Sequence, residues 1–324
     1  MSFFSLLVII DLNNNYYIDN KQVSINDSYN NDVFNGLSLT LKDNVKVFCV
    51  ILTSKKNVKE RAIHQNNTWV KRCNNYVFGS GAEDKELGIF KACHNDTYNL
   101  SFCKFKNTLT YAWKTHGDKF DWYIKADDDT YFIMENLRAF LMNKDPNKHG
   151  YYGFRMVAGT LYFSGGAGYV LSKATVKVLV EQLFEDPKYC RQVDAAFDDV
   201  EVGACLSKYE IKRGKSLDNH NKYLFSAVDP MRLFYKYPPY IVKSVDLLSD
   251  EIIPYDRNSM SDFPIAFHYI SKEMMYALEY LLYEAEVIGR KSRIDRLNDP
   301  DNINSIKKIT ERYELIKLFS KHNY

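Results

Sequence analysis

Residues 45–52 read VKVFCVIL, a continuous β-prone run. Such a run, without apolar–polar alternation, is expected of a strand buried on both faces of a sheet. Further short apolar stretches follow it, separated by stretches that are compatible with helices. The predicted strands are 45–52, 76–78, 122–126, 151–154 and 167–171, and the predicted helices are 55–69, 108–116, 136–142, 173–184 and 271–286. This alternation predicts an α/β fold with a mainly parallel sheet and helices around it.

The composition is that of an ordinary globular protein. The chain has 324 residues, of which 46% are hydrophobic and 26% charged, so it can bury a core of substantial size. It carries 43 basic and 41 acidic side chains, a formal net charge of +2. A balance so close to zero gives no reason to expect nucleic acid or another polyanion as a partner.

The chain divides into four predicted segments. Residues 1–10 contain the apolar run Ser2–Ile10, which is too short to span a membrane by itself. It is either the remnant of a signal-anchor or an apolar start in a truncated chain. Residues 11–43 are polar and rich in Asn, which predicts a stem or linker. Residues 44–288 hold the predicted strands and helices, and residues 289–324 form a charged tail.

The cysteines and glycosylation sequons bear on the cellular compartment. No two of the six cysteines have the CxxC spacing, which disfavours a zinc ribbon or a thioredoxin-like site. Their even number allows three disulfides, and six free core thiols are the alternative. N-x-[ST] sequons together with paired cysteines would favour a secretory compartment. The cysteines are at 49, 73, 93, 103, 190 and 205, and the sequons begin at Asn26, Asn66, Asn95 and Asn99.

Three consecutive aspartates, Asp127, Asp128 and Asp129, follow the predicted strand 122–126 directly. Ligands of α/β folds bind at the carboxyl ends of the strands, which is where these carboxylates are expected. Alternate residues of an extended chain point the same way, so Asp127 and Asp129 can share one divalent cation while Asp128 points elsewhere. Carboxylate oxygens suit Mg²⁺ or Mn²⁺. The alternative is a solvated acidic turn ahead of a helix.

Other polar or glycine-rich segments each allow a structural and a functional interpretation. The three glycines of Ser164–Tyr169 indicate a tight, close-packed turn rather than a phosphate loop. Asp198 and Asp199 open a predicted helix, either as dipole and capping partners or as the source of a general base. His268, in an apolar setting before a helix, is either a core residue or a ligand that completes a metal site.

Read in order, these segments resemble one family, the core 1 β1,3-galactosyltransferases within the wider galactosyltransferase/Fringe group. The resemblance spans roughly residues 45–288 and rests on five segments in the family's order. They are CVILTSKKN…TWVKRC, WYIKADDDTYF, SGGAGYVLSK, DDVEVGACL and FHYISKEMMYALEYLLYE. It implies a GT-A glycosyltransferase fold for residues 44–288, and a type II Golgi membrane protein that forms a homodimer. It also implies UDP-galactose as donor, Mn²⁺ as cofactor, and O-linked N-acetylgalactosamine on glycoproteins as acceptor.

The resemblance also implies roles for individual residues. Asp127 and Asp129 match the metal-binding carboxylates, with His268 as the third ligand, and Asp199 matches the general base. The expected donor contacts are Leu52, Thr53, Lys114, Asp127, His268 and Tyr269.

The chain departs from the family's pattern at three places. Lys106–Thr108 stands where a donor-binding Glu-Gly-Arg is expected, and the paired cysteines expected near Asn258–Asp262 are absent. Tyr235 or Tyr237 would take the place of the tryptophan that stacks on the acceptor sugar.

The cysteines on neighbouring predicted elements suggest a disulfide pattern. We predict Cys49–Cys73, because Cys49 lies on the first strand and Cys73 just past the helix that returns beside it. Cys190 and Cys205 bracket the segment that delivers Asp199, and Cys93–Cys103 would complete the set.

Two rival functions remain at this stage. One is a Fringe-like β1,3-N-acetylglucosaminyltransferase, and the other is a non-catalytic protein like the chaperone relative of this family. That relative lacks the metal-binding aspartates, whereas this chain has Asp127 and Asp129.

Overall fold

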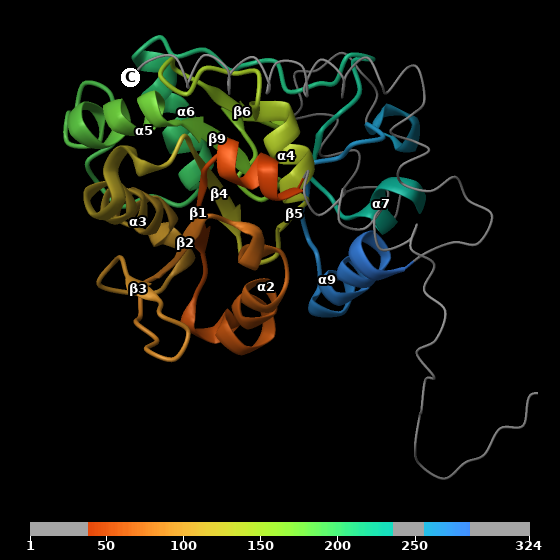
Figure 1. Cartoon of the computed structure of the whole chain (residues 1–324). Coiled ribbons are helices and arrows are strands. Elements are labelled where there is room, and N and C mark those ends of the chain that lie inside the picture. Colours follow the sequence, from red (N-terminus) through yellow and green to blue (C-terminus); the bar gives the residue numbers. More distant parts are fainter. Residues whose placement is uncertain (1–37, 236–255, 286–324) are drawn as a thin grey trace, which may run out of the picture.

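A six-stranded sheet forms the centre of the structure, a computed structural model that describes residues 38–235 and 256–285 (Figure 1). Its strand order is β3-β2-β1-β4-β9-β6. The strands are β1 Val47–Leu52, β2 Asn75–Ser80, β3 Phe90–Lys91, β4 Trp122–Asp127, β6 Tyr151–Gly153 and β9 Tyr169–Ser172. β3, β2, β1 and β4 pair in parallel, and β9 runs antiparallel to both β4 and β6. The predicted α/β fold with a mainly parallel sheet is confirmed, with β9 as the antiparallel member.

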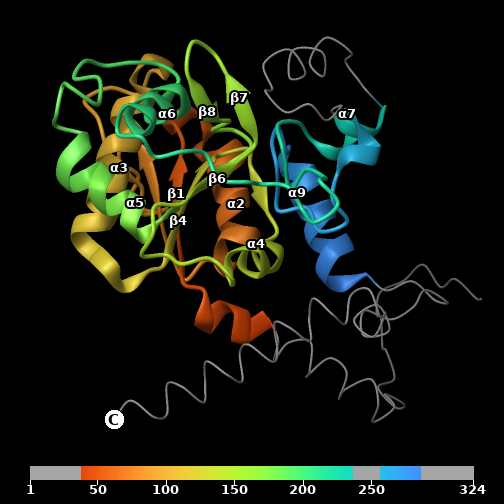
Figure 2. The same cartoon turned by 90° about the horizontal axis from the view of Figure 1, so that it is seen from above.

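Helices cover both faces of this sheet (Figures 1 and 2). One face carries α2 (Ile63–Asn67) and α4 (Met134–Leu141), and the other carries α3 (Ser101–His116), α5 (Lys173–Val178) and α6 (Asp198–Lys208). The position of β1 between the two helical layers explains why its sequence is apolar throughout. Cys49 and Ile51 belong to the core beneath α2 and α4, while Phe48 and Val50 belong to the core beneath α3. Because successive side chains of a strand point to opposite faces, a strand between two helical layers needs apolar residues at every position.

Shorter elements connect these layers. Predicted helix 55–69 is a series of short helical turns around α2, and predicted helix 173–184 continues from α5 into η6, with Ser172 as its N-cap. The turns are η1 Lys55–Asn57, η2 Val58–Ala62, η3 Trp69–Arg72, η4 Tyr98–Leu100, η5 Gly117–Lys119 and η6 Leu179–Leu183. The elements nearer the C-terminus are α7 Pro230–Tyr235, η7 Arg257–Ser259, α9 Lys272–Glu279 and η8 Tyr280–Glu284.

Helix α3 begins at Ser101, seven residues before the start predicted at 108. Its first turns are hard to recognise because Lys104 is buried there, and Thr108 is buried one turn later. Polar side chains on the buried face weaken the apolar periodicity by which an amphipathic helix is recognised. This early start changes which residues of the helix reach the carboxyl edge of the sheet.

Two small sheets lie outside the predictions. β7 (Arg155–Val157) and β8 (Leu161–Phe163) form a hairpin, and β10 (Phe225–Ser226), β11 (Ala266–Phe267) and β5 (Tyr131–Phe132) form a second sheet. Strands of two or three residues are too short to show a periodicity of their own. The second sheet joins segments that are far apart in the chain, and it is central to the site described below.

Six cysteines form three disulfides, Cys49–Cys73, Cys93–Cys103 and Cys190–Cys205. The predicted pairing is therefore confirmed. Residues 38–44 are helical and Leu41 is buried, so the folded part starts somewhat before the predicted boundary at residue 44.

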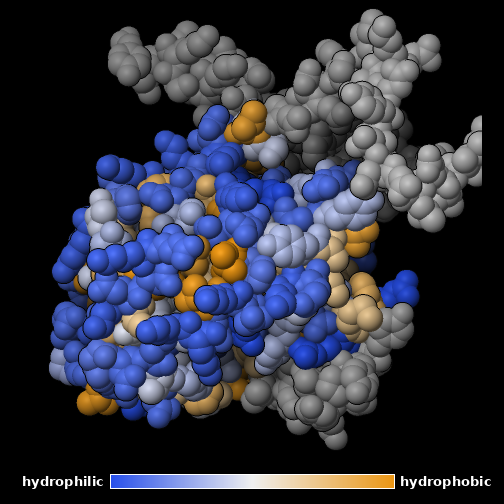
Figure 3. All heavy atoms as spheres, turned by 90° about the horizontal axis from the view of Figure 1, so that it is seen from below, coloured by the Kyte–Doolittle hydropathy of each residue, from blue (hydrophilic) through white to orange (hydrophobic). Residues whose placement is uncertain are grey.

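Several predictions lie outside the described residues. They are those for residues 1–10, for residues 11–37 of the stem, for residues 289–324, and for the side chains of Tyr235 and Tyr237. Among the residues that the structure describes, no helix has the length and apolar character needed to cross a membrane. The face drawn in Figure 3 is mostly hydrophilic, with hydrophobic residues gathered in small groups.

Candidate active site

A cavity of about 660 Å³ opens at the carboxyl ends of β1 and β4. Its lining brings together seven of the side chains that the sequence singled out. These are Leu52, Thr53, Asp127, Asp129, Asp199, His268 and Tyr269. The cavity therefore lies where ligands of α/β folds are expected to bind.

The three aspartates enter this cavity from a turn. β4 ends at Asp127, and the amide of Thr130 donates to the carbonyl of Asp127 over 3.1 Å. The Gln65 amide donates to the carbonyls of both Asp127 and Thr130, at 2.7 Å each, and so holds the turn against α2. The prediction treated this segment as extended chain. In the structure the chain instead turns after Asp127, and this turn brings the carboxylates of Asp127 and Asp129 close together.

Asp128, the middle residue, points away from the other two, as predicted. Its carboxylate accepts hydrogen bonds from Thr53 Oγ1 at 2.8 Å and Asn57 Nδ2 at 2.9 Å, and from Arg61 Nη1 at 3.1 Å. Burial raises the pKa of Asp128 to about 6. This side chain fastens the acidic turn to the loop that follows β1.

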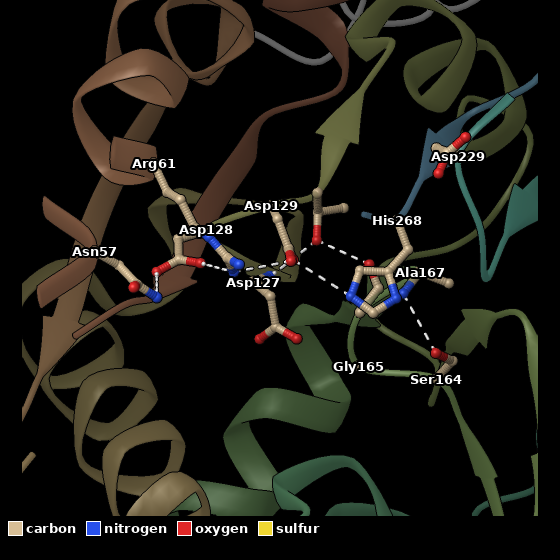
Figure 4. A network of polar contacts seen from close by, with 12 residues as sticks. Asn57, Arg61, Asp127, Asp128, Asp129, Ser164, Gly165, Ala167, Asp229 and His268 are labelled. Atoms are coloured by element: carbon tan, nitrogen blue, oxygen red, sulfur yellow. Dashed lines mark hydrogen bonds and ion pairs between the residues drawn. The ribbon is translucent and has the colours of Figure 1, made fainter. Parts of the chain in front are cut away.

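His268 reaches the aspartates because of the second small sheet. β5 follows the acidic turn directly, β11 directly precedes His268, and the two strands pair antiparallel with Phe267 opposite Tyr131. The amide of Ile270 also donates to the carbonyl of Asp129 at 2.8 Å. As a result, His268 Nε2 lies 3.3 Å from Asp129 Oδ1 (Figure 4).

Asp127, Asp129 and His268 form a cluster whose ligand atoms all lie within 4.8 Å of one another. We call these three residues the metal wall of the cavity. Two carboxylate oxygens and one imidazole nitrogen are a donor set that fits a divalent cation of the Mg²⁺ or Mn²⁺ type.

Cationic side chains compensate the charge of the metal wall. Arg61 Nη1 lies 2.9 Å from Asp129 Oδ2, and Lys125 Nζ lies 2.7 Å from Asp127 Oδ1. Burial opposes ionisation of Asp129, but the hydrogen bond from His268 and the charge of Arg61 hold its pKa below the usual value.

The start of α6 forms another part of the cavity lining, and we call Asp198 and Asp199 the base wall. Asp199 Oδ2 accepts a hydrogen bond of 2.7 Å from the amide of Gly165, and its Oδ1 accepts one of 2.9 Å from the amide of Val200. Asp198 instead forms an ion pair of 3.2 Å with Lys125 Nζ. Burial raises the pKa of both aspartates above the usual range.

Lys125 connects the two walls. It is wholly buried on β4, within 2.7 Å of Asp127 on the metal wall and 3.2 Å of Asp198 on the base wall. Burial opposes its charged form, but the two carboxylates hold the pKa of Lys125 above its usual value. This role could not be recognised from the sequence, because Lys125 is a single basic residue within the apolar part of β4.

Gly165 and Gly166, in the glycine-rich segment Ser164–Tyr169, lie in close contact with residues of both walls. A Cβ on Gly166 would lie 1.9 Å from the His268 ring, and a Cβ on Gly165 would lie 2.5 Å from Lys125 Nζ and 3.1 Å from Asp199 Cβ. Thr130 Oγ1 donates to the carbonyl of Gly166 at 2.8 Å, which ties this segment to the acidic turn. The predicted close-packed turn is thus present, and each glycine makes room for a different wall.

Lys114, a predicted donor contact, lies on the exposed face of the last part of α3 and does not line the cavity. Because α3 starts early, Ser101 and Lys104 of the same helix line the cavity instead. Lys104 Nζ lies 3.3 Å from Asp96, whose carboxylate also accepts a hydrogen bond of 2.9 Å from the amide of Gly81. The role of Lys114 as a donor contact stays a prediction from the resemblance, and Lys104 is a basic residue of α3 that lines the cavity.

Comparisons with known proteins show relatives over most of the chain. A family model described as "Fringe-like" matches residues 40–231. The chain is 33% identical over 264 residues to glycoprotein-N-acetylgalactosamine 3-beta-galactosyltransferase 1 of Xenopus laevis, covering 80% of this chain and 72% of that protein. It is 25% identical over 180 residues to chondroitin sulfate synthase 3 of Homo sapiens, covering 49% of this chain and 20% of that protein.

The chain therefore belongs to the Fringe-like family of glycosyltransferases, and within it to the core 1 galactosyltransferase family. Its mainly parallel sheet between two helical layers is the GT-A architecture that the resemblance implies. A solved glycosyltransferase involved in glycosylation of the major capsid of PBCV-1 matches 73% of this chain and 99% of its own. It does so with a TM-score of 0.38 and 12% identity, and no conclusion is drawn from that likeness.

Proposed function

We propose that this glycosyltransferase moves galactose from UDP-galactose to the 3-hydroxyl of O-linked N-acetylgalactosamine on glycoproteins, with inversion at the anomeric carbon. The observation that carries the proposal is the meeting of the metal wall and the base wall in one cavity. An inverting displacement needs a held leaving group on one side and a proton acceptor on the other. The similarity to the Xenopus laevis galactosyltransferase supports the choice of donor and acceptor.

On the metal wall, Asp127, Asp129 and His268 would hold Mn²⁺. When bound, this cation would supply compensation for the negative charge of the UDP leaving group. Leu52 and Thr53 close this side of the cavity, and Tyr269 stacks on His268 with ring centroids 3.7 Å apart. We propose these three side chains as donor contacts. Lys104, the basic residue of α3 that lines the cavity, is a further proposed donor contact.

On the base wall, Asp199 is the better candidate for the general base. Asp198 is engaged by the buried ammonium of Lys125, which favours its charged form but makes its carboxylate less available to a substrate. Asp199 accepts backbone N–H bonds from Gly165 and Val200 and has no such cation against it in the described contacts. These bonds orient the carboxylate, and burial raises its pKa and thereby its strength as a base. Asp199 would take the proton of the acceptor 3-hydroxyl as that oxygen attacks the anomeric carbon.

Two alternative functions can each be distinguished from this one by one property: the donor in the first case, and the metal cluster in the second. A Fringe-like β1,3-N-acetylglucosaminyltransferase would use UDP-N-acetylglucosamine as donor. A non-catalytic chaperone-like protein would not need a metal cluster, and Asp127, Asp129 and His268 form one here.

We further propose a lumenal location in the Golgi as a type II membrane protein, and a homodimer as the assembled state. The three disulfides support the lumenal part of this proposal, because disulfides persist in oxidising compartments. Fractionation of cells that express the tagged full-length chain, followed by protease protection, would test the location. Sedimentation of the purified protein would test the dimer.

The decisive test of the reaction is transfer to an α-N-acetylgalactosaminyl-serine peptide from UDP-galactose, with and without Mn²⁺. We expect transfer with Mn²⁺ and none after chelation. UDP-N-acetylglucosamine in parallel reactions tests the Fringe-like alternative. Full activity in EDTA would contradict the metal wall, and transfer from UDP-N-acetylglucosamine alone would contradict the proposed donor.

A further inference from the structure

Two aromatic side chains in the cavity lining have no role in the reaction as proposed so far. Tyr98 and Phe197 both line the cavity, and both are exposed, by 64% and 57%. Their rings meet edge to face with centroids 5.6 Å apart. A pair of large exposed rings inside a cavity is a candidate ligand contact, because ligand pockets are lined mainly by apolar and aromatic side chains.

The two rings are held in place by covalent cross-links. Tyr98 lies in the segment closed by Cys93–Cys103, and Phe197 lies in the segment closed by Cys190–Cys205. A backbone hydrogen bond of 3.1 Å from the amide of Phe102 to the carbonyl of Ala195 joins the two segments. The ring pair is therefore already built without a ligand, which lowers the cost of ordering it on binding.

The backbone conformation of Phe197 also supports a role in ligand binding. Its φ of 59° lies in the left-handed region, which large side chains rarely adopt. Strained backbone of this kind persists where the surrounding structure enforces it, and it is frequent at binding sites. Here it lets the chain present the Phe197 ring to the cavity and then begin α6 with Asp198.

The position of the pair decides which substrate it meets. Phe197 directly precedes the base wall, and its ring meets that of Tyr98. Burial raises the pKa of Tyr98, and the charges of Asp199, Asp198 and Asp127 raise it further, in that order. The metal wall, where the donor diphosphate would be held, is formed by other segments of the chain, the acidic turn after β4 and the residue after β11. The rings thus lie next to the base wall, to which the acceptor hydroxyl must come.

We infer that Tyr98 and Phe197 form the platform on which the acceptor sugar packs while its 3-hydroxyl faces Asp199. This inference rests on the proposed function. A hexopyranose presents C–H groups on its faces and hydroxyls around its edge. Aromatic rings can cover the C–H groups and leave the hydroxyl edge to a polar partner, and the uncharged sugar needs no ionic contact.

The test compares acceptor and donor kinetics of Tyr98→Ala and Phe197→Ala with the wild type. With the N-acetylgalactosaminyl-serine peptide, we expect each substitution to lower kcat/KM by about tenfold, the effect of losing one well-packed ring. Tyr98→Phe should stay close to wild type, because it keeps the ring. Hydrolysis of UDP-galactose without acceptor should be unchanged in all three variants, and so should their melting temperatures, because both side chains are exposed.

Matched controls are available on other surfaces. Phe263 is exposed by 56% and Tyr280 by 57%, and neither lines the cavity. Phe263→Ala and Tyr280→Ala should leave the acceptor kcat/KM unchanged.

Three results would overturn the platform. Normal transfer by the wild type with unchanged acceptor kinetics in Tyr98→Ala and Phe197→Ala would refute the platform alone. An equal loss of donor hydrolysis in these variants would assign the rings to the donor instead. A wild-type protein that hydrolyses UDP-galactose but does not modify the peptide would refute the proposed acceptor, and the platform with it.

Discussion

The metal wall and the base wall each present two aspartates to the same cavity, but in different electrostatic settings. On the metal wall, the partners of the Asp129 carboxylate are side chains, with His268 Nε2 at 3.3 Å and Arg61 Nη1 at 2.9 Å. On the base wall, Asp199 is oriented by backbone amides, with Gly165 N at 2.7 Å. Asp129 can exchange its Arg61 partner for a metal ion while His268 joins it as a ligand, whereas a carboxylate held by backbone amides is fixed by the fold itself. The comparison suggests that the metal wall is completed by its cofactor and that the base wall is complete as folded.

The largest effect is expected from removing a carboxylate of the metal wall. Asp127→Ala or Asp129→Ala should abolish transfer, because the cation would lose a ligand and the charge of the UDP leaving group would be uncompensated. Galactose transfer and Mn²⁺ binding by titration calorimetry would both be measured. Asp118→Ala, at an exposed position in η5, is the control and should match the wild type in both. Retained Mn²⁺ affinity in both wall variants would contradict the metal wall.

Replacing the carboxylate of the proposed base should separate catalysis from donor binding. Asp199→Asn should lower kcat by a factor of about 10²–10⁴, the usual contribution of a general base, with UDP binding unchanged. Asp198→Asn should be milder, because that carboxylate serves Lys125 and not the acceptor hydroxyl. If the larger loss followed from Asp198→Asn, the base would be the neighbouring residue.

Two adjacent glycines allow the walls to be disturbed one at a time. A methyl group on Gly166 would meet the His268 ring, and one on Gly165 would meet Lys125 Nζ and approach Asp199. Gly166→Ala should therefore weaken Mn²⁺ binding, whereas Gly165→Ala should mainly lower kcat, with a smaller effect on Mn²⁺ affinity that Lys125 transmits to Asp127. We expect smaller losses than for the aspartates, because the His268 and Lys125 side chains can shift to relieve the contact. Equal effects on Mn²⁺ affinity would show that the walls are not independent.

The sequence predicted the metal wall better than the fold around the base wall. Val47–Leu52 and Trp122–Asp127 are buried strands with strong apolar patterns, and the aspartates follow the second one directly, so periodicity places them at the carboxyl edge. His268 could be placed only by resemblance, because its neighbour β5 is two residues long and lies far away in the chain. No local pattern records such a pairing.

The errors have physical causes as well. The start of α3 was missed because Lys104 is buried on the helix, which weakens its apolar periodicity. Tyr98 and Phe197 gave no signal, since one exposed aromatic residue in a loop looks like any other in sequence. Their proximity depends on two disulfide-closed segments that meet only in the folded chain. Contacts of that kind follow from topology, not from composition or spacing.

The smallest effect on transfer is expected from opening the disulfide beneath the base wall. Replacing Cys190 and Cys205 by alanine opens a segment with a sequence separation of 15 residues. In the chain-entropy model this costs about 3 kcal/mol of the free energy of unfolding. Replacing Cys49 and Cys73 is the matched control, with a separation of 24 residues and a similar expected loss of about 3 kcal/mol. Stability measured by denaturant titration should therefore fall comparably in the two double variants.

The two disulfide variants should differ in kinetics where both remain folded. Opening Cys190–Cys205 frees the segment that holds Phe197 in its left-handed conformation and starts α6 at Asp198, so kcat and the acceptor KM should change by a few fold. Mn²⁺ affinity should stay at the wild-type value, because none of the three metal-wall residues lies between these cysteines. Opening Cys49–Cys73 should leave the acceptor KM unaltered, because Leu52 and Thr53, cavity-lining residues that this bond encloses, belong to the proposed donor side. If both variants lost activity in proportion to their stability, the base wall would not depend on this disulfide, and the orientation of Asp199 would rest on its hydrogen bonds to Gly165 and Val200 alone.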